Sequence, residues 1–95
     1  MRITYIVTYD IADAKRLRRA FNACTNFGNH LQYSVFECDL SPKERTEMET
    51  ELKGIIKHDE DQVLFVSLGL SSNDATLVIE ALGQPYLVRT RVTII

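Results

Sequence analysis

The sequence predicts a single α+β domain in which strand, helix, strand, strand, helix and strand follow one another. Three observations lead to this prediction. Residues 3–9 and 63–68 are rich in the β-branched and aromatic residues that favour strands. Apolar residues at helical spacing come directly after the first of these runs. A second helix start is present at Ser41, Pro42 and Glu44. This order gives an antiparallel sheet with both helices on one face.

The first strand is expected to place its residues alternately on two faces. Asp10, which ends the strand, then lies on the opposite face from Tyr5 and Tyr9. The two expected sets are Ile3, Tyr5, Val7 and Tyr9 on one face, and Thr4, Ile6, Thr8 and Asp10 on the other.

The first helix is expected to begin after Asp13, which is a suitable N-cap. Gly28 fits a left-handed stop beyond its end. The apolar residues that share its inward face are Leu17, Ala20, Phe21 and Cys24. The cations point away from that face or lie at its margin, and they are Lys15, Arg16, Arg18 and Arg19.

Residues 31–40 are expected to form strands with a tight reversal or a kink near Tyr33 and Ser34. The second helix starts with a capping box between Ser41 and Glu44. The apolar residues of its inward face are Met48, Leu52, Ile55 and Ile56.

The carboxyl-terminal part starts with a central strand over residues 63–68. Residues 76–82 fit a helix capped by Asp74 or a strand, and their Thr, Val and Ile content favours the strand. A turn at residues 83–85 and a further strand over residues 86–95 follow. We treat residues 1–95 as one domain, with residues 75–95 as extra strands at a dimer edge.

Composition sets limits on the class of protein. The chain has 95 residues, a net charge of −2 and 45% hydrophobic residues, which is ordinary for a globular domain. No apolar run is long enough to span a bilayer, and no cationic and apolar leader opens the sequence. We therefore expect a cytoplasmic protein with no membrane partner. Cys24 and Cys38 lack metal-ligand spacing and are expected to be buried thiols.

The helix-free face of such a sheet needs a cover, and its residues Thr4, Ile6 and Thr8 are mild enough to be buried. A second copy packed across a two-fold axis covers it most simply, as a sheet-to-sheet homodimer. Two Asp10 carboxylates then meet near the axis, where they repel each other unless a proton or cation lies between them. Mg²⁺ accepts such oxygen ligands. The alternative role for Asp10 is to cap the first helix.

The four cations between residues 15 and 19 have two possible roles as well. They are either a solvated helix face or a local contact for phosphate groups. Because the whole chain is slightly acidic, any contact with DNA or RNA is expected to be confined to one face.

Two segments together resemble a known family. Tyr9-Asp10-Ile11 and Gly28 precede the segment of residues 32–40, which contains Gln-Tyr-Ser-Val-Phe. At this spacing the chain resembles the small CRISPR-associated adaptation protein, the partner of the integrase. The resemblance implies a ferredoxin-like fold with an additional C-terminal strand and a symmetric dimer. It also implies a Mg²⁺-dependent endonuclease, acting on RNA or duplex DNA, that bridges integrase dimers in spacer acquisition.

The resemblance also assigns roles to individual residues. Asp10 matches the metal-binding acid, and Tyr9 belongs to the active-site motif. Arg16 and Arg19 match the basic helix that binds nucleic acid. Lys15, Arg18 and His30 are further candidates for contact with the nucleic acid, although His30 stands where the family often has an arginine.

Three other interpretations stay open at this point. The first is a non-catalytic scaffold of the integration complex with the same fold and dimer. The second is a free-standing toxin ribonuclease, since small toxins share this fold and acid. The third is an RNA-recognition module, which would expose aromatic residues on the sheet face that here carries Asp10.

Overall fold

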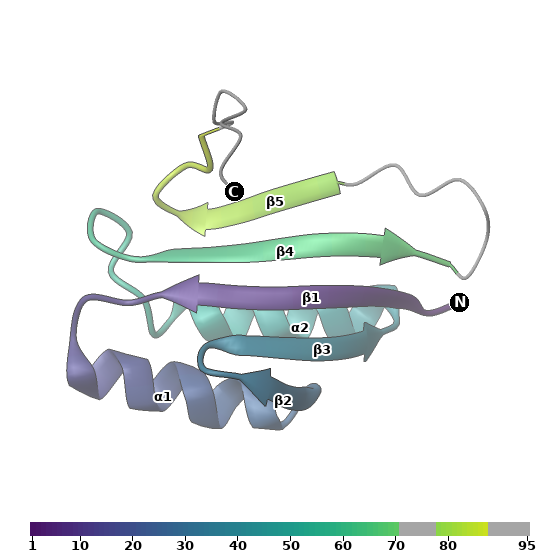
Figure 1. Ribbon diagram of the computed structural model, residues 1–95, viewed down its shortest axis with the longest axis horizontal. Helices are drawn as coiled ribbons and strands as arrows, with labels where there is room; N and C mark the ends of the chain where they lie inside the picture. Colours follow the sequence, from purple (N-terminus) through teal and green to yellow (C-terminus); the bar gives the residue numbers. More distant parts are fainter. Residues whose placement is uncertain (71–77, 88–95) are drawn as a thin grey trace, which may run out of the picture.

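The computed structural model describes residues 1–70 and 78–87 of the chain. Within them, one antiparallel sheet of five strands carries two helices on one face (Figure 1). The elements are β1 (Ile3–Asp10), α1 (Ala14–Thr25), β2 (Asn29–Gln32), β3 (Val35–Leu40), α2 (Pro42–Lys53), β4 (Gln62–Gly69) and β5 (Val78–Gly83). The strand order is β2-β3-β1-β4-β5, so β1 lies in the middle. The predicted ferredoxin-like order with one additional strand is confirmed.

The core lies between the sheet and the helices, and the predicted alternation of β1 is confirmed. Tyr5, Val7 and Tyr9 are buried, whereas Asp10 is exposed. The neighbouring strands and helices complete the core with Phe36, Cys38, Leu40, Val63, Phe65, Ala20, Cys24, Met48 and Leu52. Burial raises the pKa of Cys24 to about 12 and that of Cys38 to about 11, so both buried thiols are protonated at neutral pH.

The opposite face of the sheet has no helix over it in the described part of the chain (Figure 1). Ile6 pairs with Val66 across β1 and β4, and Val66 pairs with Ile79 across β4 and β5. These side chains and that of Leu64 are only half-buried. An apolar strip therefore runs across three strands on the same face as Asp10.

The first helix has the predicted cap but not the predicted inward face. The Asp13 carboxylate accepts a hydrogen bond from the Arg16 amide at 3.0 Å, which makes Asp13 the N-cap. The expectation that Leu17 is buried is wrong, because 42% of this residue is exposed where it borders a groove. Ala20 and Cys24 are buried as expected, and Phe21 is half-buried.

The prediction of a left-handed Gly28 is wrong as well. Among the described glycines, only Gly69 and Gly83 have a positive φ. Gly28 is required for a different reason, since a Cβ atom there would collide with the Glu37 carbonyl oxygen and the Cys38 Sγ. The chain passes too close to β3 at this position for any side chain.

The reversal predicted near Tyr33 and Ser34 is present and joins β2 to β3. Tyr33 adopts a φ of 45°, which side-chain-bearing residues rarely do. The Nε2 atom of His30 lies 2.6 Å from the Tyr33 carbonyl oxygen and closes the turn.

The second helix begins with the predicted capping box. The Ser41 side chain accepts from the Glu44 amide, and the Glu44 side chain accepts from the Ser41 amide. Met48 and Leu52 face the core, whereas Ile55 and Ile56 follow the end of the helix at Lys53. Ile56 is buried and Ile55 is half-buried.

The second helix is also tied to the sheet through Arg45. The Arg45 guanidinium lies over the rings of Phe65 and Tyr5, at 4.1 and 4.7 Å from their centres. It also donates to Glu80 of β5 at 3.0 Å. A helix residue thus contacts β1, β4 and β5 together.

The strand expected over residues 76–82 is confirmed for its described part, which is β5. The strand expected from Tyr86 does not begin there, because Tyr86 and Leu87 belong to no strand. The Gln62 side-chain amide donates to the carbonyl oxygens of Gln84 and Pro85 and holds this segment instead. Residues 76, 77 and 88–95 lie outside the described residues. In the described part of the chain, both helices are too short and too polar to cross a lipid bilayer.

Candidate active site at the end of β1

Asp10 is the last residue of β1 and pairs with Gln62 at the start of β4. It is exposed on the helix-free face, and its carboxylate makes no hydrogen bond or ion pair with any other described residue. Because Asp13 caps α1, Asp10 does not have the alternative role of a helix cap. An exposed carboxylate with no partner among the described residues can accept a ligand.

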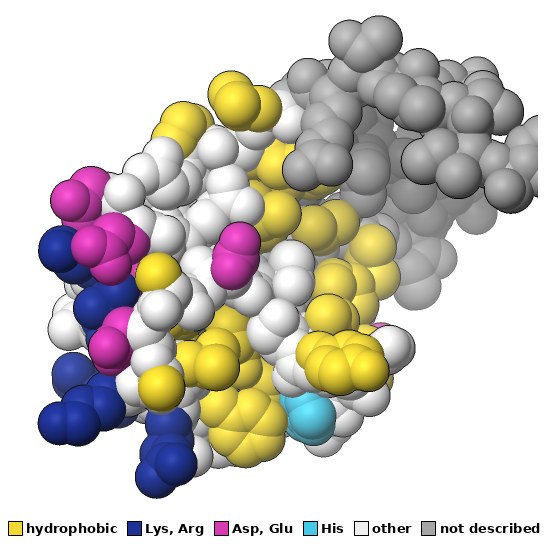
Figure 2. All heavy atoms as spheres, turned by 60° about the vertical axis from the view of Figure 1, so that its left-hand side comes forward, with side chains coloured by type: hydrophobic (Ala, Val, Ile, Leu, Met, Phe, Trp, Pro, Cys, Tyr) yellow, Lys and Arg dark blue, Asp and Glu magenta, His cyan; other side chains and the backbone are white. Residues whose placement is uncertain are grey.

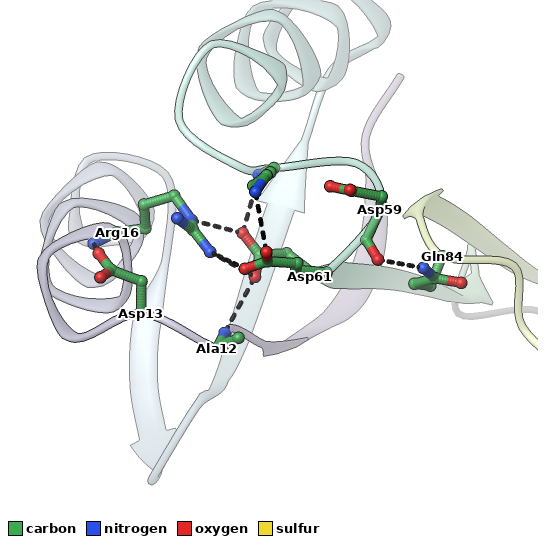
Figure 3. A network of polar contacts seen from close by, with 8 residues as sticks. Ala12, Asp13, Arg16, Asp59, Asp61 and Gln84 are labelled. Atoms are coloured by element: carbon green, nitrogen blue, oxygen red, sulfur yellow. Dashed lines mark hydrogen bonds and ion pairs between the residues drawn. The ribbon is translucent and has the colours of Figure 1, made fainter.

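The segment after Asp10 is fixed by a carboxylate that the sequence analysis left without a role. Asp61 is completely buried directly before β4 and accepts from the Ala12 amide at 2.9 Å (Figure 3). It also accepts from the Lys57 amide at 2.8 Å and from Nε of Arg16 at 2.8 Å. One side chain therefore joins the β1–α1 segment, the first turn of α1 and the segment before β4.

These donors determine the protonation of Asp61. Burial alone would raise the pKa of this carboxyl group, but the Arg16 side chain and the Lys57 and Ala12 amides lower it to about 2. Asp61 is therefore an anion at neutral pH. The position of Asp61 directly before a buried strand could have indicated a buried structural carboxylate. Two further acids, Asp59 and Glu60, come directly before it, so the sequence does not single it out.

Arg16 lies where the sequence placed it, at the margin of α1, but its guanidinium points inward. It bonds to Asp61 and, at 3.0 Å, to Glu60, and only 20% of its side chain is exposed. These hydrogen bonds raise the pKa of Arg16, which stays charged. Most of its donors are thus already used within the chain.

Lys15, Arg18 and Arg19 have a different environment. All three are exposed and border one shallow hollow on α1, and they form no ion pair with another described residue. Figure 2 shows Lys and Arg side chains along one edge of the molecule, with Asp and Glu side chains among the upper ones and apolar side chains between the lower ones and a histidine. The structure therefore brings three of the four predicted cations together on the surface.

Tyr9 and His30 do not share the face of Asp10. Tyr9 is buried on the helix side of β1, and burial, with a smaller contribution from Cys24, raises its pKa to about 12. Its hydroxyl is therefore protonated at neutral pH. His30 packs against Phe21 and Phe36, with ring centres 5.0 and 5.1 Å apart, and holds the β2–β3 turn.

The predicted magnesium site depends on a second copy of the chain. Among the described residues of one copy, no three His, Cys, Asp or Glu side chains group together around a possible ion. Asp10 supplies one hard oxygen donor group, which is the type of ligand that Mg²⁺ prefers. The donor chemistry fits magnesium provided that two Asp10 residues share it.

The sequence also matches a family model. The model describes the CRISPR associated protein Cas2 and matches residues 1–75. The chain belongs to the Cas2 family. This confirms the resemblance inferred from Tyr9, Asp10 and the segment of residues 32–40.

Curated relatives agree with the Cas2 assignment. The CRISPR-associated endoribonuclease Cas2 1 of Rhodospirillum rubrum is 39% identical over 82 residues, covering 86% of this chain and 79% of that protein. The CRISPR-associated endoribonuclease Cas2 of Geobacter sulfurreducens is 42% identical, covering 77% of each chain. The CRISPR-associated endonuclease Cas2 of Halalkalibacterium halodurans is 35% identical, covering 67% of this chain and 72% of that one.

Solved Cas2 structures have a similar fold. Streptococcus pyogenes Cas2 is 34% identical with a TM-score of 0.62, covering 65% of this chain and 81% of that one. A further crystal structure, titled as that of Cas2, is 28% identical with a TM-score of 0.69, covering 94% of this chain and all of that one.

Proposed function

We propose that this Cas2 protein is a homodimeric, Mg²⁺-dependent phosphodiesterase of CRISPR adaptation, with one Asp10 from each protomer at a shared metal. The names of its relatives, endoribonuclease and endonuclease, support a nuclease. The observation that carries the proposal is the exposed Asp10 carboxylate, which has no partner among the described residues and stands at the end of the central strand. Both RNA and duplex DNA are candidate substrates in this proposal.

The dimer is argued from the helix-free face. Ile6, Leu64, Val66 and Ile79 are half-buried there and form the apolar strip on the same face as Asp10. Burying such a strip against its own copy removes apolar surface from water. A two-fold axis then places the same residues on both sides of the contact.

The roles of the residues follow from their positions. When bound, Mg²⁺ would polarise the phosphoryl oxygen and activate water. The Asp10 carboxylates would hold the ion, while Lys15, Arg18 and Arg19 would neutralise neighbouring phosphate groups. Asp61 and Arg16 would keep the segment after Asp10 in place, and Tyr9, which is protonated at neutral pH, would not act as a base.

A scaffold that holds integrase dimers together is the second candidate. The observation that favours it is that, among the described residues, Asp10 stands in no group of three possible metal ligands, and Tyr9 lies on the other side of the strand. A scaffold needs the dimer and the cations but not catalysis, so the two functions are compatible. The family match argues against a free-standing toxin.

The deciding experiment is a cleavage assay with Mg²⁺ titration on single-stranded RNA and duplex DNA. Asp10→Asn keeps the size of the side chain but removes its charge, and we expect a loss on the order of 100-fold. Asp39→Asn is the matched control, since Asp39 is also exposed and pairs with Thr4 at the other end of the same face. Chelation by EDTA should abolish cleavage.

Equal cleavage by wild type and Asp10→Asn, or none with any divalent ion, would remove catalysis from the proposal. An integration assay with the integrase separates the two candidates. Asp10→Asn would support spacer integration in full if the protein is a scaffold.

A further inference from the structure

A groove of about 580 Å³ lies between α1 and the β2–β3 turn, on the helix side of the sheet. Leu17 and Phe21 supply apolar surface from the helix, and Tyr33 and Ser34 supply the other wall from the turn. The buried Tyr9 also lines it, and Arg18 contributes a cation. None of the described residues that line this groove is acidic.

Tyr33 is the most unusual residue of the groove. It is 84% exposed, and its ring stacks on no other aromatic ring of the described residues. Its φ of 45° is unfavourable for a residue with a side chain. His30 holds the Tyr33 carbonyl oxygen at 2.6 Å, and its own ring is packed on Phe21 and Phe36. The turn is therefore held in place by His30, and it leaves the Tyr33 ring exposed.

The chemistry of the groove restricts its ligand. A planar ring can stack on Tyr33 and rest on Leu17 and Phe21, while an attached anion meets Arg18. Lys15 and Arg19 extend the positive surface beyond Arg18 in the adjoining hollow. An aromatic ring followed by regularly spaced anions is a single-stranded nucleic acid, in which bases are free to leave their own stack. A base-paired nucleotide in a duplex cannot enter without being extruded.

We propose that this groove binds one unpaired nucleotide of a single-stranded nucleic acid, with its base on Tyr33 and its phosphate at Arg18. The proposal rests on the proposed function in that the substrate is a nucleic acid, and it adds the position at which an unpaired base is held. The site adjoins the strand that carries Asp10, since the Tyr9 amide donates to the Ser34 carbonyl oxygen at 3.2 Å.

The test measures binding without cleavage, in an Asp10→Asn background of the full chain. Fluorescence anisotropy follows a labelled oligonucleotide of roughly ten nucleotides as single-stranded RNA, single-stranded DNA and duplex DNA of one sequence. Tyr33→Gly removes the ring and also relieves the positive φ, so the variant is expected to melt no lower than its parent. Tyr33→Phe keeps the ring, and Leu31→Ala is a matched control because Leu31 is 53% exposed on β2 outside the groove.

We expect Tyr33→Gly to weaken binding of both single strands by roughly 5- to 100-fold, as for the loss of one stacked base. Tyr33→Phe and Leu31→Ala should stay within about twofold of the parent, and duplex binding should be unchanged in all variants. Single-strand binding by Tyr33→Gly equal to that of the parent would overturn the proposal. An equal loss on duplex DNA, or no binding of single strands by the parent, would overturn it too.

These outcomes are separate from those of the cleavage assay. Metal-dependent cleavage of duplex DNA that needs Asp10 but not Tyr33 would support the proposed function and contradict the proposed nucleotide-binding groove. Tight single-strand binding through Tyr33 by a protein that never cleaves would support the groove and contradict the nuclease.

Discussion

Nε of Arg16 lies 2.8 Å from Oδ2 of Asp61, a carboxylate with no exposed surface (Figure 3). The pair joins residues 45 positions apart, on the first turn of α1 and directly before β4. The pair gives Arg16 a different role from Lys15, Arg18 and Arg19, although all four belong to one basic segment. The three exposed cations are free to meet phosphate groups, whereas Arg16 mainly supports the fold.

This separation predicts different salt dependences of nucleic-acid binding. Each phosphate contact that is lost should reduce the slope of log Kobs against log salt by about one. We expect this reduction for Arg18→Gln and for Arg19→Gln. Arg16→Gln should lower the melting temperature and leave the slope unchanged, and a full unit of change for Arg16→Gln would show that it binds phosphate. The measurement is an anisotropy titration at several salt concentrations.

Asp61 predicts a specific loss of stability in acid. Its pKa is lowered from an ordinary value of 3.8 to about 2, so its stabilising contribution is complete above about pH 4. The contribution is lost as the pH falls from about 4 to about 2. Urea unfolding at a series of pH values should show this loss in the wild type and not in Asp61→Asn.

At neutral pH, Asp61→Asn should reduce the free energy of unfolding by about 3 kcal/mol, since Arg16 loses its main partner in a mostly buried position. Asp59→Asn is the control, because Asp59 is an exposed neighbour whose carboxylate is outside this network. Equal stabilities for the two variants would contradict the structural role of Asp61.

The close approach at Gly28 predicts opposite results for two glycines. Gly28→Ala should destabilise the protein by about 2 kcal/mol or more, because the new methyl group meets the Glu37 backbone and Cys38. Gly54→Ala should be neutral or stabilise it by up to about 1 kcal/mol, because its φ is −74° and the nearest atom to a new Cβ is 3.5 Å away. Chemical denaturation of both variants tests the pair, and a tolerated Gly28→Ala would contradict the packing against β3.

The apolar strip predicts how the proposed dimer can be broken. Leu64→Glu places a charge in the proposed contact, and we expect sedimentation velocity to show a monomer at concentrations where the wild type is a dimer. Leu17→Glu changes an apolar residue that is 42% exposed on α1, on the helix side of the sheet, and should leave the dimer intact. A Leu64→Glu variant that remains dimeric would place the contact elsewhere.

Features that depend on neighbours in the sequence were predictable. The alternation of β1 placed Asp10 on the face opposite Tyr9, and the capping box at Ser41 and Glu44 formed as written. Both depend on residues within a few positions of each other, where backbone geometry alone decides the outcome.

Features that depend on distant segments were not predictable. The basic segment alone does not indicate that Arg16 points toward Asp61, because the contact requires β4 to lie beside β1. Gly28 was assigned a φ preference when its requirement comes from β3 passing close by. Leu17 matched the helical spacing of the core, but the short β2–β3 hairpin leaves a groove beside it.

The anchoring of the Ala12 and Lys57 amides on one carboxylate also limits how the site can move. The end of β1 cannot move outward easily, because the buried Asp61 carboxylate would then lose hydrogen-bond donors. Asp10 is therefore carried on a rigid frame that does not close over a substrate. In the proposed function, a bound nucleic acid would therefore adapt its shape to Asp10, because Asp10 does not move toward the nucleic acid.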